Sequence, residues 1–263
     1  MAMAVPGATK VANGVREVGA MAAVGIESVR KVFSRPWPVA EFLDQCWFIA
    51  KVTTVPVILI SIPFGMVISL QVGALIRQLG ADAHLGSALV LAVVREQAPI
   101  ATALLIAGAG GSAIAADLGA RKIREELDAM MVLGIDPIQR LVVPRVLACM
   151  LVAFFLNGLV SVVGVSGGYV FNVILQDGTP GAYIASFTAL AQLPDLYVGL
   201  IKSLIFGLIA AIVAAYKGMN ANGGPKGVGD AVNESVVITF LLLFVANFVL
   251  SLIYLQIIPP KGG

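Results

Sequence analysis

The sequence predicts an all-α polytopic membrane protein, with amphipathic helices at its N-terminus followed by five transmembrane helices. Of its 263 residues, 59% are hydrophobic and 12% are charged, and the mean hydropathy is +0.97. Soluble domains carry about 25% charged residues, so the chain has too little charge to cover its apolar groups with a polar surface. Several uncharged runs are also long enough to cross a hydrocarbon layer of about 30 Å at about 1.5 Å per residue.

The N-terminal segment places apolar residues at helical spacing between charged ones. Residues 15–35 form one apolar face and one basic-leaning polar face, a pattern typical of an amphipathic helix. Such a helix could pack on protein, but a membrane-spanning run follows directly, which favours a position in the membrane interface. Residues 39–50 predict a second short interfacial helix. We therefore expect an elbow of two interfacial helices in residues 1–50 and a membrane domain in residues 51–263.

Five apolar runs predict the membrane spans. The first, residues 52–76, is uncharged and contains Pro56 and Pro63, which are expected to kink it. The other four runs cover residues 98–116, 146–176, 196–216 and 235–258.

Three segments between these spans remain to be assigned. Residues 85–94 are apolar but too short to span alone, so they either extend the following span or lie along the outer surface. Residues 178–194 are uncharged but broken by prolines, which predicts an outer loop or a surface helix. Residues 217–231 are polar and glycine-rich and predict a loop, in which Asp230 would cap the last helix.

Small residues in the second and third spans predict close packing between helices, because they let helix backbones approach each other in lipid. The residues expected to serve this role are Gly108, Gly111, Ser112, Gly164 and Gly168.

Basic residues are distributed unevenly between the two sides of the membrane. With a cytoplasmic N-terminus, residues 1–51, 117–145 and 217–231 lie on one side and hold 13 of the 17 Lys and Arg residues. Basic residues concentrate in cytoplasmic loops. The pattern therefore predicts that residues 117–145 are cytoplasmic and that the C-terminus is outside.

A polar segment of mixed charge separates the second and third spans. Residues 117–133 predict one short helix in which Arg121 and Glu125 lie one turn apart. Gly134 suits the end of that helix, and the Asp-Pro pair that begins at Asp136 prevents its continuation. A solvated connector would have a similar composition, but the ordered pattern and the retained apolar residues favour a surface on which a soluble partner docks.

Three ionisable residues lie at or within the predicted spans. Arg95 and Glu96 precede the second span, and Lys202 interrupts the fourth. An ionisable group inside a membrane is costly and is a functional candidate by default, although Lys202 could instead extend to the lipid headgroups. We expect the three residues to border an outward-facing cavity for the polar head of a lipid.

Other chemistry is not expected of this chain. Cys46 and Cys149 lie in apolar runs and His84 has no second type of ligand nearby, so neither a disulfide nor a metal site is expected. The motif GxxxxGK followed by Ser or Thr is absent, and Lys226 of the glycine-rich loop has no Ser or Thr after it. We therefore expect no enzymatic activity, no bound cofactor and no nucleic-acid binding.

Several short motifs resemble those of one transporter family. They are REQAP at 95–99, GSAIAADLG at 111–119, EELDAM at 125–130, LGIDP at 133–137, LVVPRVLA at 141–148 and GGPKGVGDAV at 223–232. Together they resemble the MlaE/YrbE family of permeases. The long basic N-terminus further resembles the YrbE permeases of actinobacterial (mycobacterial) Mce systems.

The resemblance implies a transmembrane permease subunit of an ATP-driven Mce lipid transporter. The helix between the second and third spans would be the coupling helix that docks on an ATPase, with the residues Arg121, Glu125, Glu126, Asp128, Ala129 and Met130, followed by Gly134 and Pro137. The resemblance also supports a lipid pathway at Arg95, Glu96 and Lys202. Asn247 joins this set, at a position where proteobacterial relatives carry an acid.

The resemblance also implies partners. They are a second YrbE-type permease, a cytoplasmic ABC ATPase dimer that binds ATP and Mg, Mce-domain substrate-binding proteins outside, and membrane lipids. An ATP-independent secondary carrier or channel for a hydrophobic solute is the alternative function, and a membrane scaffold without transport is a third. The absence of Asp and Glu from the predicted span cores disfavours ion coupling by a carrier.

Overall fold

Most of the described residues are helical, and five helical segments are long and apolar enough to cross a membrane. The computed structural model describes residues 6–34, 38–81, 84–176, 179–187 and 191–257, with no strand among them. The five segments are Val39–Gln78, Leu85–Ile123, Ile138–Leu175, Leu193–Met219 and Gly224–Ile257. The predicted all-α polytopic fold is therefore confirmed.

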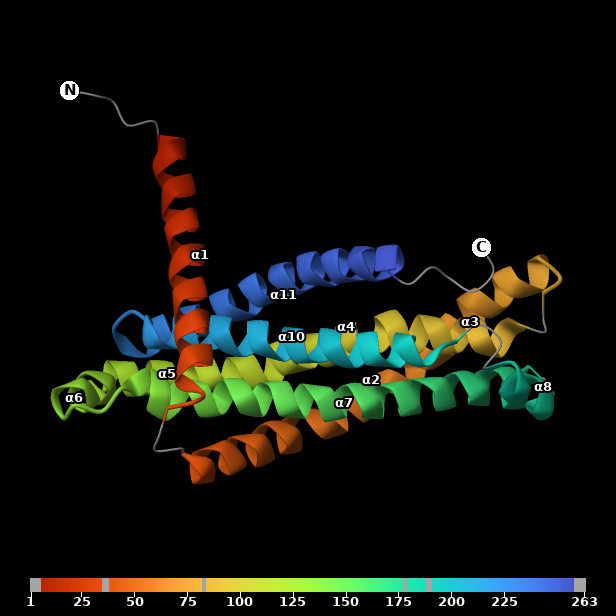
Figure 1. Cartoon of the computed structure of the whole chain (residues 1–263), viewed down its shortest axis with the longest axis horizontal. Helices are drawn as coiled ribbons and strands as arrows, with labels where there is room; N and C mark the ends of the chain where they lie inside the picture. The colour runs from red at the N-terminus through yellow and green to blue at the C-terminus, as the bar shows by residue number, and fades with distance from the viewer. Residues whose placement is uncertain (1–5, 35–37, 82–83, 177–178, 188–190, 258–263) are drawn as a thin grey trace.

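The spans run along the long axis of the molecule, and α1 (Pro6–Lys31) stands across them near one end (Figure 1). The first span is α2 (Val39–Gln78), the fourth is α10 (Leu193–Met219) and the fifth is α11 (Gly224–Ile257). The second joins α3 (Leu85–Leu91), η2 (Ala92–Gln97), α4 (Ala98–Leu105), η3 (Ile106–Gly111) and α5 (Ser112–Ile123). The third joins η4 (Ile138–Val142), α7 (Val143–Tyr169) and η5 (Val170–Leu175), and the η segments are π-helical turns. Two short helices, α6 (Glu126–Val132) and α8 (Pro180–Ala185), lie at opposite ends of the bundle (Figure 1).

The first span begins earlier than predicted. Residues 39–50 do not form a separate interfacial helix, because α2 continues through them for 40 residues in all. Lys51 is the only charge between Asp44 and Arg77, and one lysine does not interrupt a helix. The predicted separate helix over residues 39–50 is therefore wrong, whereas the interfacial position of α1 stays a prediction.

The second span is longer than predicted. Residues 85–94 continue directly into α4, so they extend the span rather than lie on a surface. As a result, Arg95 and Glu96 lie inside a helical segment of 39 residues and not at its start.

The glycine-rich loop is shorter than predicted. α10 reaches Met219 and α11 begins at Gly224, whose φ of +86° suits glycine. Asp230 lies inside α11 and is not the predicted cap. The prediction failed because Gly227 lies within α11 and allows close packing there, and does not form a turn. A Cβ on Gly227 would collide with the backbone of Asn222.

Small residues bring α2 and α7 together. The buried residues of α2 recur at every fourth position, and they are Ile49, Thr53, Val57, Ser61, Gly65, Ser69 and Gly73. A Cβ on Gly65 would overlap the carbonyl of Gly164, and a Cβ on Gly167 would come within 2.6 Å of the Ile62 carbonyl oxygen. Close backbone approach of this kind is how helices associate in lipid.

Two of the glycines predicted to pack helices also face the second span. A Cβ on Gly164 would lie 2.9 Å from Val93 Cγ1, and one on Gly168 would lie 2.7 Å from Leu89 Cδ1. Both distances are shorter than real Cβ contacts, so these positions hold the third span against the second.

The other three residues predicted to pack helices have looser surroundings. Gly111 is buried at ordinary contact distance from Ala214, and Ser112 is half-buried. Around a Cβ on Gly108, the described structure has no atom within 4 Å apart from its own helix. Gly108 therefore takes no part in packing within the described chain.

Ion pairs fasten α1 to one end of the bundle. Lys31 pairs with Glu27 and with Asp136, and Glu17 pairs with Lys217 at the end of α10. Burial lowers the pKa of Lys31, but the hydrogen bonds and charges of Asp136 and Glu27 outweigh it, so the net pKa is raised. The N-terminal part of α1 projects beyond the spans (Figure 1).

Replacing Gly65 with Ala should loosen α2 from α7. The added Cβ would overlap backbone rather than a flexible side chain, and overpacking of this kind typically destabilises by about 1–3 kcal/mol. We expect a lower midpoint of thermal unfolding in detergent, measured by the reaction of the buried Cys149 with a thiol-reactive dye. Gly108→Ala is the matched control and should leave the midpoint unchanged or raise it. Equal losses in both variants would contradict the packing role of Gly65.

Candidate functional site

Two groups of polar residues are distinct in the described structure, one within the spans and one at the end of the bundle that carries α6. The first, which we call the intramembrane charge cluster, comprises Arg95, Glu96, Lys202, Asn247 and Ser251. The second, which we call the α6 tip, comprises residues 125–137.

Lys202 is at the centre of the intramembrane charge cluster. Its side chain is 1% exposed. Its Nζ donates to both carboxylate oxygens of Glu96 at 3.1 Å, to the Arg95 carbonyl oxygen at 3.2 Å and to Ser251 Oγ at 2.8 Å. Lys202 therefore points into the bundle and does not extend along the lipid to the headgroups.

Glu96 connects three helices in the cluster. It lies on η2 and accepts hydrogen bonds from Lys202 on α10 and from two residues of α11, Asn247 Nδ2 at 3.2 Å and Ser251 Oγ at 3.0 Å. Its side chain is still 40% exposed, so a ligand has access to it. Asn247 Oδ1 is buried without a hydrogen-bond partner among the described residues.

Arg95 extends the cluster toward Tyr254. Its guanidinium lies 4.4 Å from the centre of the Tyr254 ring, which is cation–π geometry, and its Nε is 3.9 Å from Glu96 Oε1. The Tyr254 hydroxyl donates to Asp195 Oδ1 at 2.6 Å, and Asp195 also accepts the backbone N–H of Gln192 at 2.8 Å. The four residues predicted for the lipid pathway are thus brought together, and Tyr254 and Asp195 border them.

Sequence reasoning missed Ser251, Tyr254 and Asp195, although their spacing from predicted residues carries a signal. Asn247, Ser251 and Tyr254 follow one another at intervals of four and three, which places them on one face of a helix. Asp195 precedes Lys202 by seven residues, which is two turns on the same face.

The charges of the cluster determine what it can bind. Arg95, Glu96 and Lys202 together carry one net positive charge inside the spans, and the bordering acid Asp195 is bound to the Tyr254 hydroxyl. An intramembrane charge of this kind favours an anionic or strongly dipolar group, which would be costly to place among apolar side chains alone.

The α6 tip differs from the single helix predicted for residues 117–133. α5 ends at Ile123, Glu125 is left-handed with a φ of +61°, and α6 begins at Glu126. Glu125 therefore does not face Arg121 as predicted. A non-glycine residue in this conformation costs about 1–3 kcal/mol and persists only when its surroundings hold it.

Ion pairs hold α6 against α5 and account for the break between them. Arg121 pairs with Asp117 at 3.2 Å and with Glu126 at 3.7 Å. Lys122 pairs with Asp128 at 3.0 Å. The Arg121–Glu126 and Lys122–Asp128 pairs connect residues on the two sides of the break, so they favour the folded-back arrangement over one straight helix, whereas Asp117 lies on α5 with Arg121.

Arg145 anchors the helices beneath the α6 tip. Its side chain is 1% exposed, and it donates to Asp117 Oδ2 at 2.6 Å and to the Leu141 carbonyl oxygen at 2.7 Å. It also pairs with Glu41 of α2 at 3.1 Å. A charge this deeply buried needs such partners. Arg145, which sequence reasoning missed as a site residue, therefore joins α2, α5 and the third span.

The outer surface of the α6 tip is apolar beside the exposed Glu125. Leu127 is buried against the bundle, and Gly134 ends α6 as predicted with a φ of +75°. The exposed apolar residues are Met131, Val132, Leu133 and Ile135. Of the remaining residues predicted to couple, Ala129 is exposed, whereas Glu126, Asp128, Met130 and Pro137 are half-buried. Adjacent exposed apolar residues of this kind are typical of an interaction surface.

Comparison with known proteins identifies one family. The family model described as Permease MlaE matches residues 42–253. A probable ABC transporter permease protein of Synechocystis is 42% identical over 192 residues, which are 73% of each chain. Another of Rickettsia typhi is 30% identical over 237 residues, 90% of this chain and 91% of the relative. The chloroplastic protein TRIGALACTOSYLDIACYLGLYCEROL 1 of Arabidopsis thaliana is 35% identical over 196 residues, 73% of this chain and 55% of the relative.

Removing only one partner of the Glu96–Lys202 pair should lower the free energy of unfolding, and the two single variants together should lose more than the double variant. Glu96→Gln leaves the buried Lys202 ammonium without its carboxylate, and breaking a buried pair typically costs about 3–5 kcal/mol. Because the Glu96 side chain is 40% exposed, we expect the lower end of that range.

A double-mutant cycle of unfolding free energies, measured in detergent, tests this pair. Adding Lys202→Met to Glu96→Gln should recover part of the loss, with a coupling of about 0.5–3 kcal/mol. Strictly additive losses would show that the two side chains do not interact.

Proposed function

The chain belongs to the MlaE family of ABC transporter permeases, and from this premise we propose that it is a transmembrane subunit of an ATP-driven lipid transporter of the Mce type. In this proposal, a cytoplasmic partner ATPase hydrolyses ATP, the α6 tip receives its motion, and the intramembrane charge cluster borders the lipid pathway. The observation that carries the proposal is the α6 tip, an exposed acidic and apolar surface that is held firmly to three spans.

The attachment of the α6 tip supports a coupling role. Arg121 pairs with Glu126 and Lys122 pairs with Asp128, which holds α6 to α5, and Arg145 holds α5 to α2 and to the third span. A displacement of the tip would therefore move several spans together. The exposed Glu125 and the neighbouring apolar residues offer a partner both charge and apolar area.

The intramembrane charge cluster supports a lipid as the substrate. A lipid can place its polar head at the positively charged cluster while its chains contact the apolar side chains of the spans. The name of the Arabidopsis relative contains that of a glycerolipid, trigalactosyldiacylglycerol. We infer that Glu96 and Arg95, which are the more exposed charges of the cluster, contact the head directly.

A second YrbE-type permease would complete the pathway. In the most apolar stretch of each span, the share of residues buried by this chain is 22% in α2 and 11% in α11. The same share is 50–56% in the other three spans. The exposed faces of α2 and α11 are thus available to a second permease and to lipids. Mce-domain proteins on the outer side would exchange the lipid with this pair.

An ATP-independent carrier is the competing function, and the position of Glu96 bears on it. Glu96 lies inside the second span, where a carboxylate is a candidate for ion coupling. Lys202 at 3.1 Å already neutralises this carboxylate, so a coupling cation would have to displace it. We therefore favour the ATP-driven transporter.

Glu125→Lys should release the ATPase from the complex. The residue is exposed, so the fold should be unchanged, while charge reversal at a contact typically weakens binding by about tenfold or more, or about 1.4 kcal/mol. We expect a P-loop ATPase to co-purify with the full chain and with Asp44→Lys, which alters an exposed acid at the start of α2, but not with Glu125→Lys.

Lipid transfer by the reconstituted complex separates the two functions. Transfer between liposomes should require ATP and should be lost in Glu125→Lys. Transfer that persists without any ATPase and follows an ion gradient would replace the proposal with the carrier.

The distribution of basic residues predicts that the α6 tip faces the cytoplasm. Two of the 17 basic residues, Arg35 and Lys261, lie outside the described residues. In a Cys46→Ser background, the cysteine of Val132→Cys should react with a membrane-impermeant thiol reagent only after spheroplasts are opened. The cysteine of Thr179→Cys, next to α8 at the other end (Figure 1), should react in intact spheroplasts. The reverse labelling pattern would invert the topology and remove the ATPase contact.

A further inference from the structure

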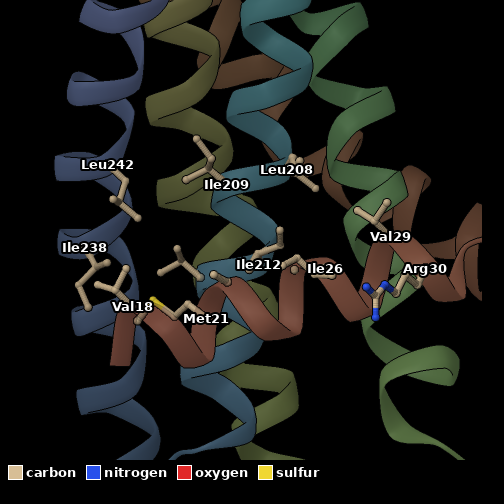
Figure 2. Close-up of a pocket in the computed structure, with 13 residues that line it drawn as sticks. Val18, Met21, Ile26, Val29, Arg30, Leu208, Ile209, Ile212, Ile238 and Leu242 are labelled. Carbon is tan, nitrogen blue, oxygen red and sulfur yellow. The ribbon is translucent and has the colours of Figure 1, made fainter. Parts of the chain in front are cut away.

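A groove outside the proposed lipid pathway lies between α1 and the spans. Its volume of about 640 Å³ falls within the range of about 300–1,000 Å³ that is typical of small-molecule sites. Residues of α1, α10 and α11 line it, and all of them are apolar except Arg30. Figure 2 shows α1 passing across the spans, with Leu208 and Leu242 beyond it along α10 and α11.

We propose that this groove binds one anionic phospholipid from the surrounding leaflet, with an acyl chain against α10 and α11 and the phosphate at Arg30. The site is separate from the intramembrane charge cluster. The lipid bound here would be a structural ligand that holds α1 in place, so the inference does not depend on which molecule is transported.

The charges of α1 favour an anionic head. Glu17 and Glu27 of α1 are each paired with a lysine. In contrast, the described structure has no carboxylate oxygen within 4 Å of Arg16 or Arg30. Arg30 is exposed and is the only charged residue among the described residues that line the groove. A basic side chain at the edge of an aliphatic groove in the membrane interface matches a phosphate attached to an acyl chain.

The shape of the groove favours a lipid chain over a protein helix. A transmembrane helix is about 10 Å wide and rises about 1.5 Å per residue, so the volume of about 640 Å³ would hold only about five of its residues. Gly25 sets the depth by bringing α1 onto α10, since a Cβ there would lie 2.9 Å from Ile212 Cδ1. Val18 and Ile26 remain more than half exposed, and an acyl chain in the groove would cover apolar surface at both.

Photo-reactive lipids test the proposal on the full chain in nanodiscs. Phosphatidylglycerol and phosphatidylcholine with identical acyl chains are compared, and cross-linked peptides are identified by mass spectrometry. We expect both lipids to label α1 and α10 or α11, with phosphatidylglycerol about fivefold ahead. Arg30→Gln should remove that preference and Arg30→Lys should retain it. Arg16→Gln, on the same helix but away from the groove, is the matched control and should leave the preference intact.

A second pair of variants tests the groove itself. Ala22→Leu fills the groove and should reduce labelling by both lipids, whereas Ala23→Leu adds the same bulk to a residue that does not line it and should leave labelling unchanged. Equal labelling by the two lipids in the unaltered protein, or equal losses in Arg16→Gln and Arg30→Gln, would overturn the proposal. Cross-links from α1 to a second permease chain in place of lipid would also overturn it and assign the groove to a protein contact.

Discussion

Close approach of helix backbones through small residues is the constraint on which the rest of this structure depends. Lipid provides no hydrophobic drive for helices to associate, so packing must come from shape. α2 supplies a buried, mostly small residue every fourth position, and glycines of α7 receive them. The same two spans are also joined by an ion pair, between Glu41 at the start of α2 and Arg145 of the third span. The contact between α2 and the third span thus extends from the closely packed glycines to the ion pair beneath the α6 tip.

The two polar centres share one electrostatic arrangement. Each has a cation that is 1% exposed, Lys202 or Arg145, and each cation is held by carboxylates that keep contact with the surroundings. The Glu96 and Asp117 side chains are both 40% exposed. Burying only the cation limits the desolvation penalty, because the partly exposed acids retain some hydration. The arrangement fixes three helices at each centre while leaving an acid accessible to a ligand or a partner.

Composition and uncharged runs were sufficient to predict five spans, because apolar length is a property of the sequence alone. The ionisable residues of the cluster could be found for a similar reason, since Glu96 and Lys202 are rare types for their surroundings. The break at Glu125 could not be predicted, because ion pairs between α5 and α6 hold it, and the local pattern reads as one helix. Arg145 was missed because a basic residue at the start of an apolar run is normally an interfacial anchor.

Glu96, which faces Lys202, lies within the π-helical turn η2. A π-turn adds one residue to a helix, and such turns are frequent at functional sites. Each residue of an α-helix turns the chain by about 100°, so the extra residue of η2 changes the direction in which the residues before it face relative to those after it. The same span ends in α5, beneath the α6 tip. One continuous helical segment therefore carries the acid of the charge cluster and the foundation of the α6 tip, so the position of one centre along the span constrains that of the other.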